Sequence, residues 1–174
     1  MRAGCPESKR WGEALCQAFK VQKGLDIVIP KPTRSYGSTM LMSDTKCISQ
    51  FIKKGVAGDD IVLKSARIQF YSYTYVADAV SGLLMILLKG ENGEAFNIAE
   101  EHSDIMLKDI AAIIASINNK TVVFEVPDTI EAAGYSTATK ARLNGHKLQK
   151  LGWIPKYDIS SGLNRTISIL RTLK

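Results

Sequence analysis

Cys5 and Lys9 stand four residues apart near the beginning of this 174-residue sequence. In a helix, that spacing places two side chains on the same face, one turn apart. An ammonium group beside a thiol lowers the pKa of the thiol, so the pair could exchange a proton with a bound substrate. The alternative is that Cys5 takes no part in chemistry and that Lys9 is an ordinary surface lysine.

Metal-ligating side chains are few. The sequence has three cysteines, Cys5, Cys16 and Cys47, with no CxxC pair, and its only histidines are His102 and His146. A zinc site needs three or four such ligands close together, so we expect no metal site. Three cysteines are not the even-numbered set of a disulfide framework, which favours a reducing compartment. We therefore expect a cytoplasmic protein. Cys16 and Cys47 fall on apolar helix faces and are predicted to be packing residues.

The sequence has no glycine-rich turn between a strand and a helix. Neither GxxGxxG nor GxGxxG occurs among its 13 glycines. Such a turn allows a pyrophosphate to approach the backbone amides at a helix N-terminus. These residues therefore contain no dinucleotide-binding fingerprint.

The elements that must position these side chains alternate between helical and extended patterns, which predicts an α/β protein. Residues 26–30 form a short apolar run, typical of a strand covered on both faces, and a loop is predicted over 31–43. Ser43 or Asp44 could cap the next helix, and Asp158 the last one. Helices are predicted near 7–22, 44–56, 76–88, 107–117, 145–151 and 159–172, further strands at 61–63, 70–75, 95–98 and 121–124, and a loop near 127–139.

The net charge of +6 raises the question of a nucleic-acid partner. The excess is local, because residues 140–174 hold eight Lys or Arg against one acid, Asp158. These bases alternate with apolar residues, as on the solvated face of an amphipathic helix, and no helix-turn-helix signature accompanies them. We therefore expect no nucleic-acid partner. The longest apolar stretch, 79–88, is too short to cross a membrane, so we expect no membrane association either.

Six segments, in order, resemble the extended short-chain dehydrogenase/reductase family, in its NAD-dependent nucleotide-sugar epimerase/dehydratase branch. They are CPESKR (5–10), similar to the YxxSK catalytic helix; KPTRSYGS (31–38), similar to RxxNxYGP; DTKCISQFI (44–52), similar to the stretch before the substrate-covering helix; SYTYVAD (72–78), similar to SFxYVxD; GEAFNI (93–98), similar to GxxYNI; and LQKLGWIP (148–155), similar to KLxxLGWxP. One such match is weak evidence, but six in the family's order are specific.

The resemblance covers essentially the whole chain and implies the C-terminal part of a Rossmann-type sheet plus a small α/β substrate-binding portion. Residues 1–43 are expected to belong to the NAD-binding domain. Residues 44–174 are expected to form mainly the substrate-binding portion, with 76–98 returning to the Rossmann part. The family's glycine-rich NAD loop precedes its catalytic helix and is not in this sequence. We therefore expect a truncated protein that is inactive alone.

In the family, the tyrosine and lysine of YxxSK act together as hydride passes to NAD. The lysine favours the phenolate and binds the nicotinamide ribose, and the tyrosine exchanges a proton with the sugar hydroxyl. The resemblance thus implies NAD as the cofactor, with Lys9 and Pro32 as contacts to it. Cys5 stands at the tyrosine position, but a thiol sulfur reaches only about 2.8 Å from its Cα whereas a phenolic oxygen reaches about 6.5 Å. We expect that Cys5 cannot replace the tyrosine.

The substrate implied by the resemblance is a nucleotide-diphosphate sugar, carrying UDP or dTDP and processed through a 4-keto intermediate. Arg34 stands where the family has an Asn that contacts the diphosphate, and Lys46 matches a basic position. Tyr71 stands where an Arg commonly clamps the diphosphate, and a tyrosine lacks that charged fork. Asp78 is expected to cap or orient its helix. Four aromatic residues are expected in the core: Tyr36, Tyr73, Tyr75 and Trp153.

Two functions follow from these observations. The first is that of a nucleotide-sugar epimerase/dehydratase-like protein whose pocket is partly altered. The alternative is a non-catalytic remnant or accessory subunit that acts through protein contacts. In either case, exposed strand edges and apolar patches lead us to expect a homo-oligomer.

Overall fold

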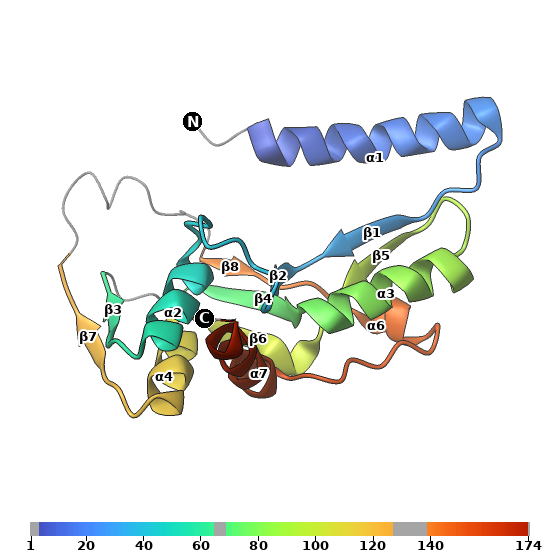
Figure 1. Cartoon of the computed structure of the whole chain (residues 1–174). Helices are drawn as coiled ribbons and strands as arrows, with labels where there is room; N and C mark the ends of the chain where they lie inside the picture. Colours follow the sequence, from blue (N-terminus) through green and yellow to red (C-terminus); the bar gives the residue numbers. More distant parts are fainter. Residues whose placement is uncertain (1–3, 65–68, 127–138, 174) are drawn as a thin grey trace.

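The computed structural model describes residues 4–64, 69–126 and 139–173, and the side chains from residue 7 onward. It confirms the α/β prediction (Figure 1). The predicted loop near 127–139 lies outside the described residues except for Thr139. The helices are α1 (Gly4–Lys23), α2 (Cys47–Ala57), α3 (Val76–Lys89), α4 (Leu107–Ile117), α6 (His146–Gln149) and α7 (Ile159–Thr172), with a 3-10 turn η1 (Glu101–Ser103). The strands are β1 (Ile29–Pro32), β2 (Arg34–Tyr36), β3 (Ile61–Leu63), β4 (Phe70–Tyr75), β5 (Ala95–Ile98), β6 (Asp104–Met106), β7 (Val122–Phe124) and β8 (Lys140–Ala141).

The strands form three small sheets. β1 pairs with β5 and β3 pairs with β7, both in parallel. β4 is the centre of the third sheet, with β6 antiparallel on one edge and with β2 and β8 parallel on the other. Because Arg34 lies opposite Tyr73 and Ala141 opposite Tyr71, Ser72 of β4 faces the gap between β2 and β8.

Some strand boundaries differ from the prediction. The strand expected over 26–30 begins at Ile29 and continues to Pro32, and the loop expected over 31–43 contains β2. The short strands β6 and β8 were not predicted at all. These segments have no apolar alternation of their own, and they are strands because β4 supplies their hydrogen-bonding partners.

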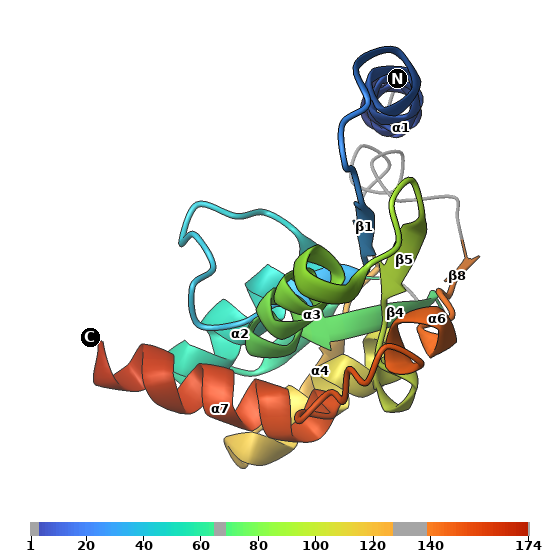
Figure 2. The same ribbon diagram turned by 90° about the vertical axis from the view of Figure 1, so that its right-hand side faces the viewer.

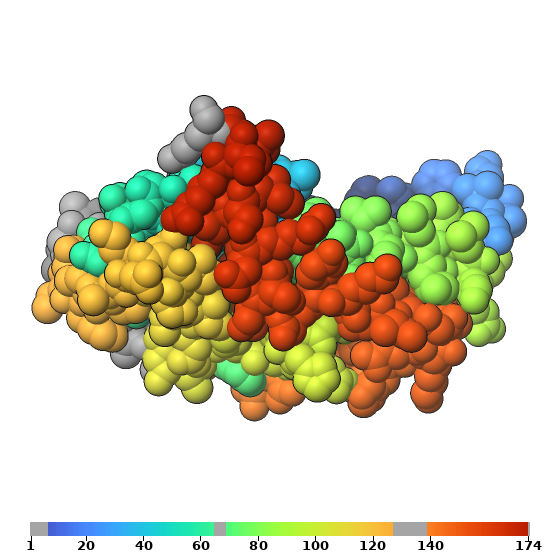
Figure 3. Space-filling model, turned by 60° about the horizontal axis from the view of Figure 1, so that its bottom comes forward, coloured from blue at the N-terminus to red at the C-terminus, as the bar shows by residue number. Residues whose placement is uncertain are grey.

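Buried side chains form two clusters. The larger lies between β4 and helices α2, α4 and α7, and the smaller joins α3 and β5 to α6. Tyr36, Tyr73 and Tyr75 lie in the first cluster and Trp153 in the second, which confirms that all four are core residues. The C-terminal third contributes to both clusters, and Figure 3 shows residues 140–173, orange to red, crossing the face between α4 and α3. The division into domains at residue 43 stays a prediction.

Carboxylates form hydrogen bonds at or near the starts of three helices. Asp78 is buried and accepts hydrogen bonds from the backbone N–H groups of Lys156 and Tyr157, each at 2.9 Å, so it orients α3 against the segment leading to α7. Asp158 caps α7, as predicted, by accepting from Ser161 N at 2.7 Å. The expected cap of α2 by Ser43 or Asp44 is wrong: the helix begins at Cys47, its N-cap residue is Lys46, and Asp44 instead accepts a hydrogen bond from the Lys46 backbone.

Helix α1 is set off from the rest of the molecule, as Figures 1 and 2 both show. Its contacts come from its C-terminal two thirds, where Glu13 pairs with Lys31 at 2.8 Å and Gln17 donates to Gly93 O at 2.8 Å. The apolar face predicted for this helix is exposed, with Trp11 at 71%. None of the described helices combines the length and apolar character needed to cross a membrane.

Candidate functional site

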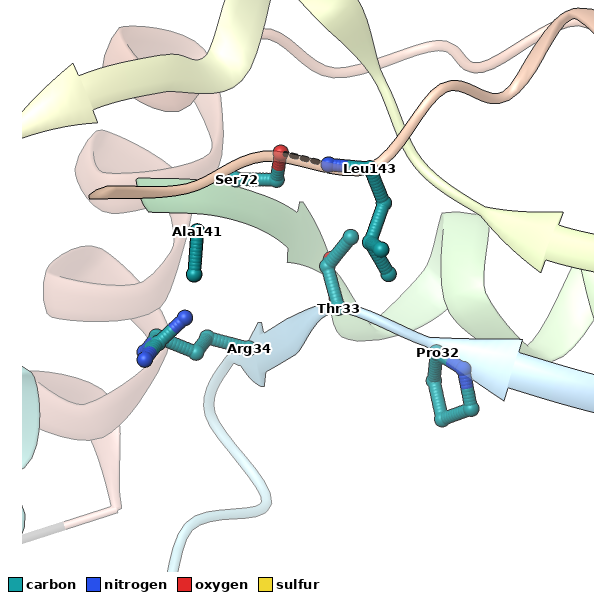
Figure 4. A pocket seen from close by; sticks show the side chains of 6 residues that line it. All are labelled: Pro32, Thr33, Arg34, Ser72, Ala141 and Leu143. Atoms are coloured by element: carbon teal, nitrogen blue, oxygen red, sulfur yellow. Dashed lines mark hydrogen bonds between the residues drawn. The ribbon is translucent and has the colours of Figure 1, made fainter. Parts of the chain in front are cut away.

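A cavity of about 280 Å³ opens at the gap between β2 and β8 (Figure 4). Its lining residues are Pro32, Thr33, Arg34, Ser72, Ala141 and Leu143. Pro32 is the last residue of β1, so the cavity lies at the carboxyl end of the parallel pair β1–β5. Open α/β sheets bind ligands at this end of their strands. Pockets for whole ligands measure roughly 300–1,000 Å³, so this cavity suits one portion of a larger ligand.

The neutral polar side chains of the wall, Thr33 and Ser72, form hydrogen bonds with groups behind the lining or with the backbone. Ser72 Oγ donates to Asp104 Oδ1 at 2.5 Å and accepts from Leu143 N at 2.9 Å. The hydroxyl oxygens of Thr33 and Thr74 lie 2.7 Å apart. These bonds join the three segments of the wall (32–34, β4 and 141–143) to one another and to β6, and they hold the shape of the wall.

Arg34 is the charged residue of the lining. Its Cζ lies 3.5 Å from the ring centroid of Tyr71, a cation–π contact, and no carboxylate of the described residues forms an ion pair with it. Burial raises the pKa of the neighbouring Tyr73, and Arg34 opposes that shift only in part. Tyr73 therefore stays neutral at pH 7 and supplies no negative charge to Arg34.

A second arginine near the cavity already has a partner. Arg142 Nε lies 2.5 Å from Asp104 Oδ2, and the Asp104 side chain is 6% exposed. Sequence reasoning missed Asp104 and Arg142, because they meet only through the short strands β6 and β8. Ser72 lies within the SYTYVAD segment, which was the one available sequence signal for the β4 side of the cavity.

The structure brings three of the sequence-predicted site residues together. Pro32 and Arg34 line the cavity, and Tyr71 supports Arg34. Lys46 does not line it; its side chain is 81% exposed, and its ammonium lies 3.4 Å from Asp44 Oδ2.

The predicted catalytic positions lie on α1, away from the cavity lining. Lys9 is exposed on this helix. Cys5 belongs to the first turn of α1, but its side chain lies outside those described. Cys16 and Cys47 are partly buried, and Cys47 packs against the larger core cluster. In the described parts of the chain, no three His, Cys, Asp or Glu side chains are grouped so that they could hold a metal ion.

The family model "NAD dependent epimerase/dehydratase family" matches residues 2–99, more than half of the chain. The matched range contains α1, β1, β2, β4 and β5. Four of the six cavity-lining residues fall within it: Pro32, Thr33, Arg34 and Ser72.

Similar proteins of known activity include UDP-glucuronic acid decarboxylase 1 of Danio rerio, 26% identical over 95% of this chain and 38% of the relative. UDP-glucuronic acid decarboxylase 5 of Arabidopsis thaliana is 28% identical over 94% of this chain and 46% of the relative. The dTDP-D-glucose 4,6-dehydratase of Mus musculus is 25% identical over the same shares. The chain therefore spans less than half the length of these relatives.

Solved structures show the same fold. UDP-glucose 4-epimerase from Thermotoga maritima, solved with UDP-glucose, superposes with a TM-score of 0.79 at 23% identity, over 93% of this chain and 52% of that one. UDP-glucuronic acid 4-epimerase from Bacillus cereus, solved with UDP-glucuronic acid and NAD, gives 0.78 at 20% identity, over 94% and 51%. The identities are low, so these likenesses establish the Rossmann-type fold and no more.

Proposed function

Because the chain belongs to the NAD-dependent epimerase/dehydratase family, we propose that it forms the nucleotide-sugar-binding portion of an enzyme that epimerises, dehydrates or decarboxylates a UDP- or dTDP-sugar. The observation that carries this proposal is the cavity at Pro32–Arg34, at the carboxyl end of β1. Its shape is fixed by wall hydrogen bonds, and its charge is positive. A sugar joined to a nucleoside diphosphate is the chemical class shared by the substrates in the relatives' names.

NAD is the cofactor that the family name implies, and this chain fits it only in part. The 174 residues contain no glycine-rich turn, so they supply no cradle for the NAD pyrophosphate. Lys9 on α1 and Pro32 at the end of β1 are the positions that the resemblance assigns to the cofactor. These residues alone therefore do not position NAD for hydride transfer, and we expect this chain alone to be inactive.

Cys5 stands where the family has its proton-transferring tyrosine. A proton donor must come within about 3 Å of the sugar oxygen, and the thiol is shorter than a phenol by roughly 3–4 Å. Side-chain adjustment does not close such a gap. The proposal therefore gives Cys5 no part in proton transfer.

The alternative of an accessory subunit has less support. The exposed apolar faces of α1 and α3 fit protein contacts, but an enzyme subunit could use them equally well. A positively charged cavity, four of whose six lining residues fall within the family-matched range, is explained by a ligand and not by a protein contact alone.

The test is titration of the chain with UDP-glucuronic acid, UDP-glucose and dTDP-glucose, followed by thermal unfolding and calorimetry. Sugar nucleotides should raise the melting temperature, since a ligand at 100 times its Kd stabilises the folded state by about 2.7 kcal/mol. Free glucuronic acid and glucose are the controls and should have no effect. Absence of any response to all three sugar nucleotides would refute the proposal.

A further inference from the structure

One carboxylate holds the β8 side of the cavity without lining it. Asp104, on β6, lies opposite Ser72 in the antiparallel pairing of β6 with β4. Its Oδ1 atom accepts from Ser72 Oγ at 2.5 Å, and its Oδ2 atom lies 2.5 Å from Arg142 Nε. Both carboxylate oxygens are therefore engaged. The side chain is 6% exposed, and Asp104 is not among the six residues that line the cavity.

We propose that Asp104 is a positioning residue of the cavity: through Ser72 and Arg142 it fixes residues 141–143 as one wall. The affinity for the ligand then depends on a side chain that the ligand does not touch. This inference rests on the proposed function, and it identifies the group that sets the shape of the site for a nucleotide sugar.

The backbone pairing of β8 with β4 ends where this wall begins. Its last pair is Tyr71 with Ala141. Two residues further on, the N–H of Leu143 donates at 2.9 Å to the hydroxyl oxygen of Ser72, the bond drawn as a dashed line in Figure 4. A side-chain hydroxyl thus attaches this segment to β4 beyond the end of the strand pairing, and it places Leu143 at the cavity.

The Asp104 carboxylate orients the hydroxyl of Ser72. A serine hydroxyl has one proton to donate and two lone pairs with which to accept. Because its proton is directed to Asp104 Oδ1, a lone pair remains for the N–H of Leu143. Ser72 is fully buried, so solvent does not take the place of the carboxylate. Without Asp104, the hydroxyl is free to rotate and the bond to Leu143 is weakened.

Arg142 provides a second attachment of the same segment. Successive side chains of an extended segment point to opposite faces. In agreement, Ala141 and Leu143 line the cavity, whereas Arg142 between them does not. Its Cζ lies 5.4 Å from the ring centroid of Phe70, and its Nε is held by Asp104. The charge of Arg142 is therefore paired within the fold, and the role left to this residue is to hold the wall.

The experiment uses the full 174-residue chain and three probes: UDP-glucuronic acid, UDP-glucose and dTDP-glucose. Affinity is measured by calorimetry, and hydrogen exchange of the Leu143 amide is followed by NMR. Asp104→Ala should weaken sugar-nucleotide binding by about 3- to 30-fold, the range for residues that act on a site through other groups. The Leu143 amide should exchange faster in this variant, because its acceptor is no longer fixed. Ser72→Ala should have both effects.

Asp104→Asn distinguishes positioning from a general loss of stability. Asparagine keeps an oxygen that accepts from Ser72, but it loses the charge that pairs with Arg142. This variant should therefore keep slow exchange at Leu143 and bind sugar nucleotides more tightly than Asp104→Ala does. Near-ultraviolet circular dichroism shows whether each variant is folded. If Asp104→Ala is not folded, Ser72→Ala supplies the same two measurements.

Asp60→Ala is the matched control. Asp60 Oδ1 accepts from Thr121 N at 2.9 Å and from Thr121 Oγ1 at 3.2 Å, so this carboxylate also joins two segments that are distant in the sequence. Neither residue lines the cavity. Sugar-nucleotide affinity should stay within about 2-fold of wild type, and Leu143 exchange should not change, because separate sites act independently.

The double variant Asp104→Ala with Ser72→Ala tests whether the two side chains act through one bond. It should bind no more weakly than the more affected single variant, since each single change already breaks the same connection to Leu143. Losses in affinity that add in full would show that Asp104 acts by another route and would contradict the inference.

The outcomes separate this inference from the proposed function. Equal affinities of wild type, Asp104→Ala and Ser72→Ala would overturn the role of Asp104 and leave the proposed function standing. A wild-type chain that binds none of the three sugar nucleotides would refute the proposed function, and faster Leu143 exchange in Asp104→Ala would still support the fixing of the wall. A Leu143 amide that exchanges equally fast in wild type and in both alanine variants would overturn the inference whatever binds.

Discussion

Single carboxylates form hydrogen bonds at or just before the starts of α7 and α2. Asp158 Oδ1 accepts from the Ser161 backbone at 2.7 Å and from the Ser161 hydroxyl at 2.6 Å. The hydrogen bonds from Ser161 hold the pKa of Asp158 below its usual range. Asp44 does the same before α2, where bonds from Lys46 and Ser49 lower its pKa. These residues act on folding rather than on the cavity.

Asp158→Ala should destabilise the chain at pH 7 by about 1 kcal/mol, the usual cost of losing an N-cap. Because the folded-state pKa of Asp158 is depressed, its charge contributes stability above the unfolded pKa near 4, and this contribution is lost as the pH falls through the folded value. Urea unfolding at pH 7 and pH 3 should therefore show a smaller difference between wild type and variant at pH 3. Asp158→Asn keeps a capping side chain but not the charge, so at pH 7 it should lose part of the stability that Asp158→Ala loses. A difference that is equal at both pH values would argue against a role for the charge.

Gly162 allows α7 to approach Tyr36 closely. A Cβ at this position would overlap the Tyr36 hydroxyl oxygen, and Tyr36 is buried with that oxygen 3.4 Å from Ile159 O. Gly162→Ala should therefore destabilise by about 1–3 kcal/mol in urea unfolding, although alanine is the better helix former. Tyr36→Phe in the same chain should restore part of the loss. Gly12→Ala, in open space on α1, is the control and should not destabilise.

At the scale of elements, β1 has its backbone N–H donors along only one of its two edges, the edge that faces β5. Ile29 N and Thr33 N donate to β5, so Pro30 and Pro32, which alternate with them, face the other side. Prolines have no N–H, and that edge therefore offers no donors at these two positions. The sequence prediction had included strand edges among the causes of association. The exposed helix faces are better candidates, because α3 presents an apolar stripe of Val80, Leu83, Leu84, Leu87 and Leu88.

We expect the chain to form dimers or larger species through these helix faces. Leu84 and Leu88 are 53% and 79% exposed and lie one turn apart on α3. Leu84→Glu with Leu88→Glu should shift the chain toward monomer in light scattering, because charged residues oppose apolar contact. Leu41→Glu alters a leucine that is 73% exposed in a loop and should leave the mass unchanged. A wild-type chain that is monodisperse and monomeric would contradict this prediction.

For the whole molecule, calorimetry can compare the affinity for the nucleotide of the substrate with the affinity for NAD. The chain carries a candidate ligand cavity at Pro32–Arg34 but no glycine-rich turn. Calorimetry should therefore detect UDP binding and no micromolar NAD binding by the same preparation, since the NAD pyrophosphate lacks its backbone cradle. Micromolar NAD affinity would show that other residues of this chain bind the dinucleotide.

Sequence alone determined the α/β class, the order of the main helices and strands, and the family. Apolar periodicity and side-chain size are local properties, so α3, α4 and β4 were found close to their true bounds. The cap at Asp158 and the buried tyrosines of β4 followed from residue type and alternation in the same way. Six ordered segments were enough for the family because their spacing is fixed by the fold they share.

Tertiary structure alone decided how the candidate site is assembled. β2, β6 and β8 exist because β4 pairs with them, and the cavity exists because β2 and β8 leave a gap on one edge of β4. Lys46 and Arg34 were expected together, yet Lys46 lies outside the lining, with its ammonium near Asp44. Arg34 and Tyr71 are 37 positions apart in the sequence, and only the register that sets Arg34 opposite Tyr73 stacks one on the other. Non-local pairing depends on the whole fold at once, and no window of residues contains that information.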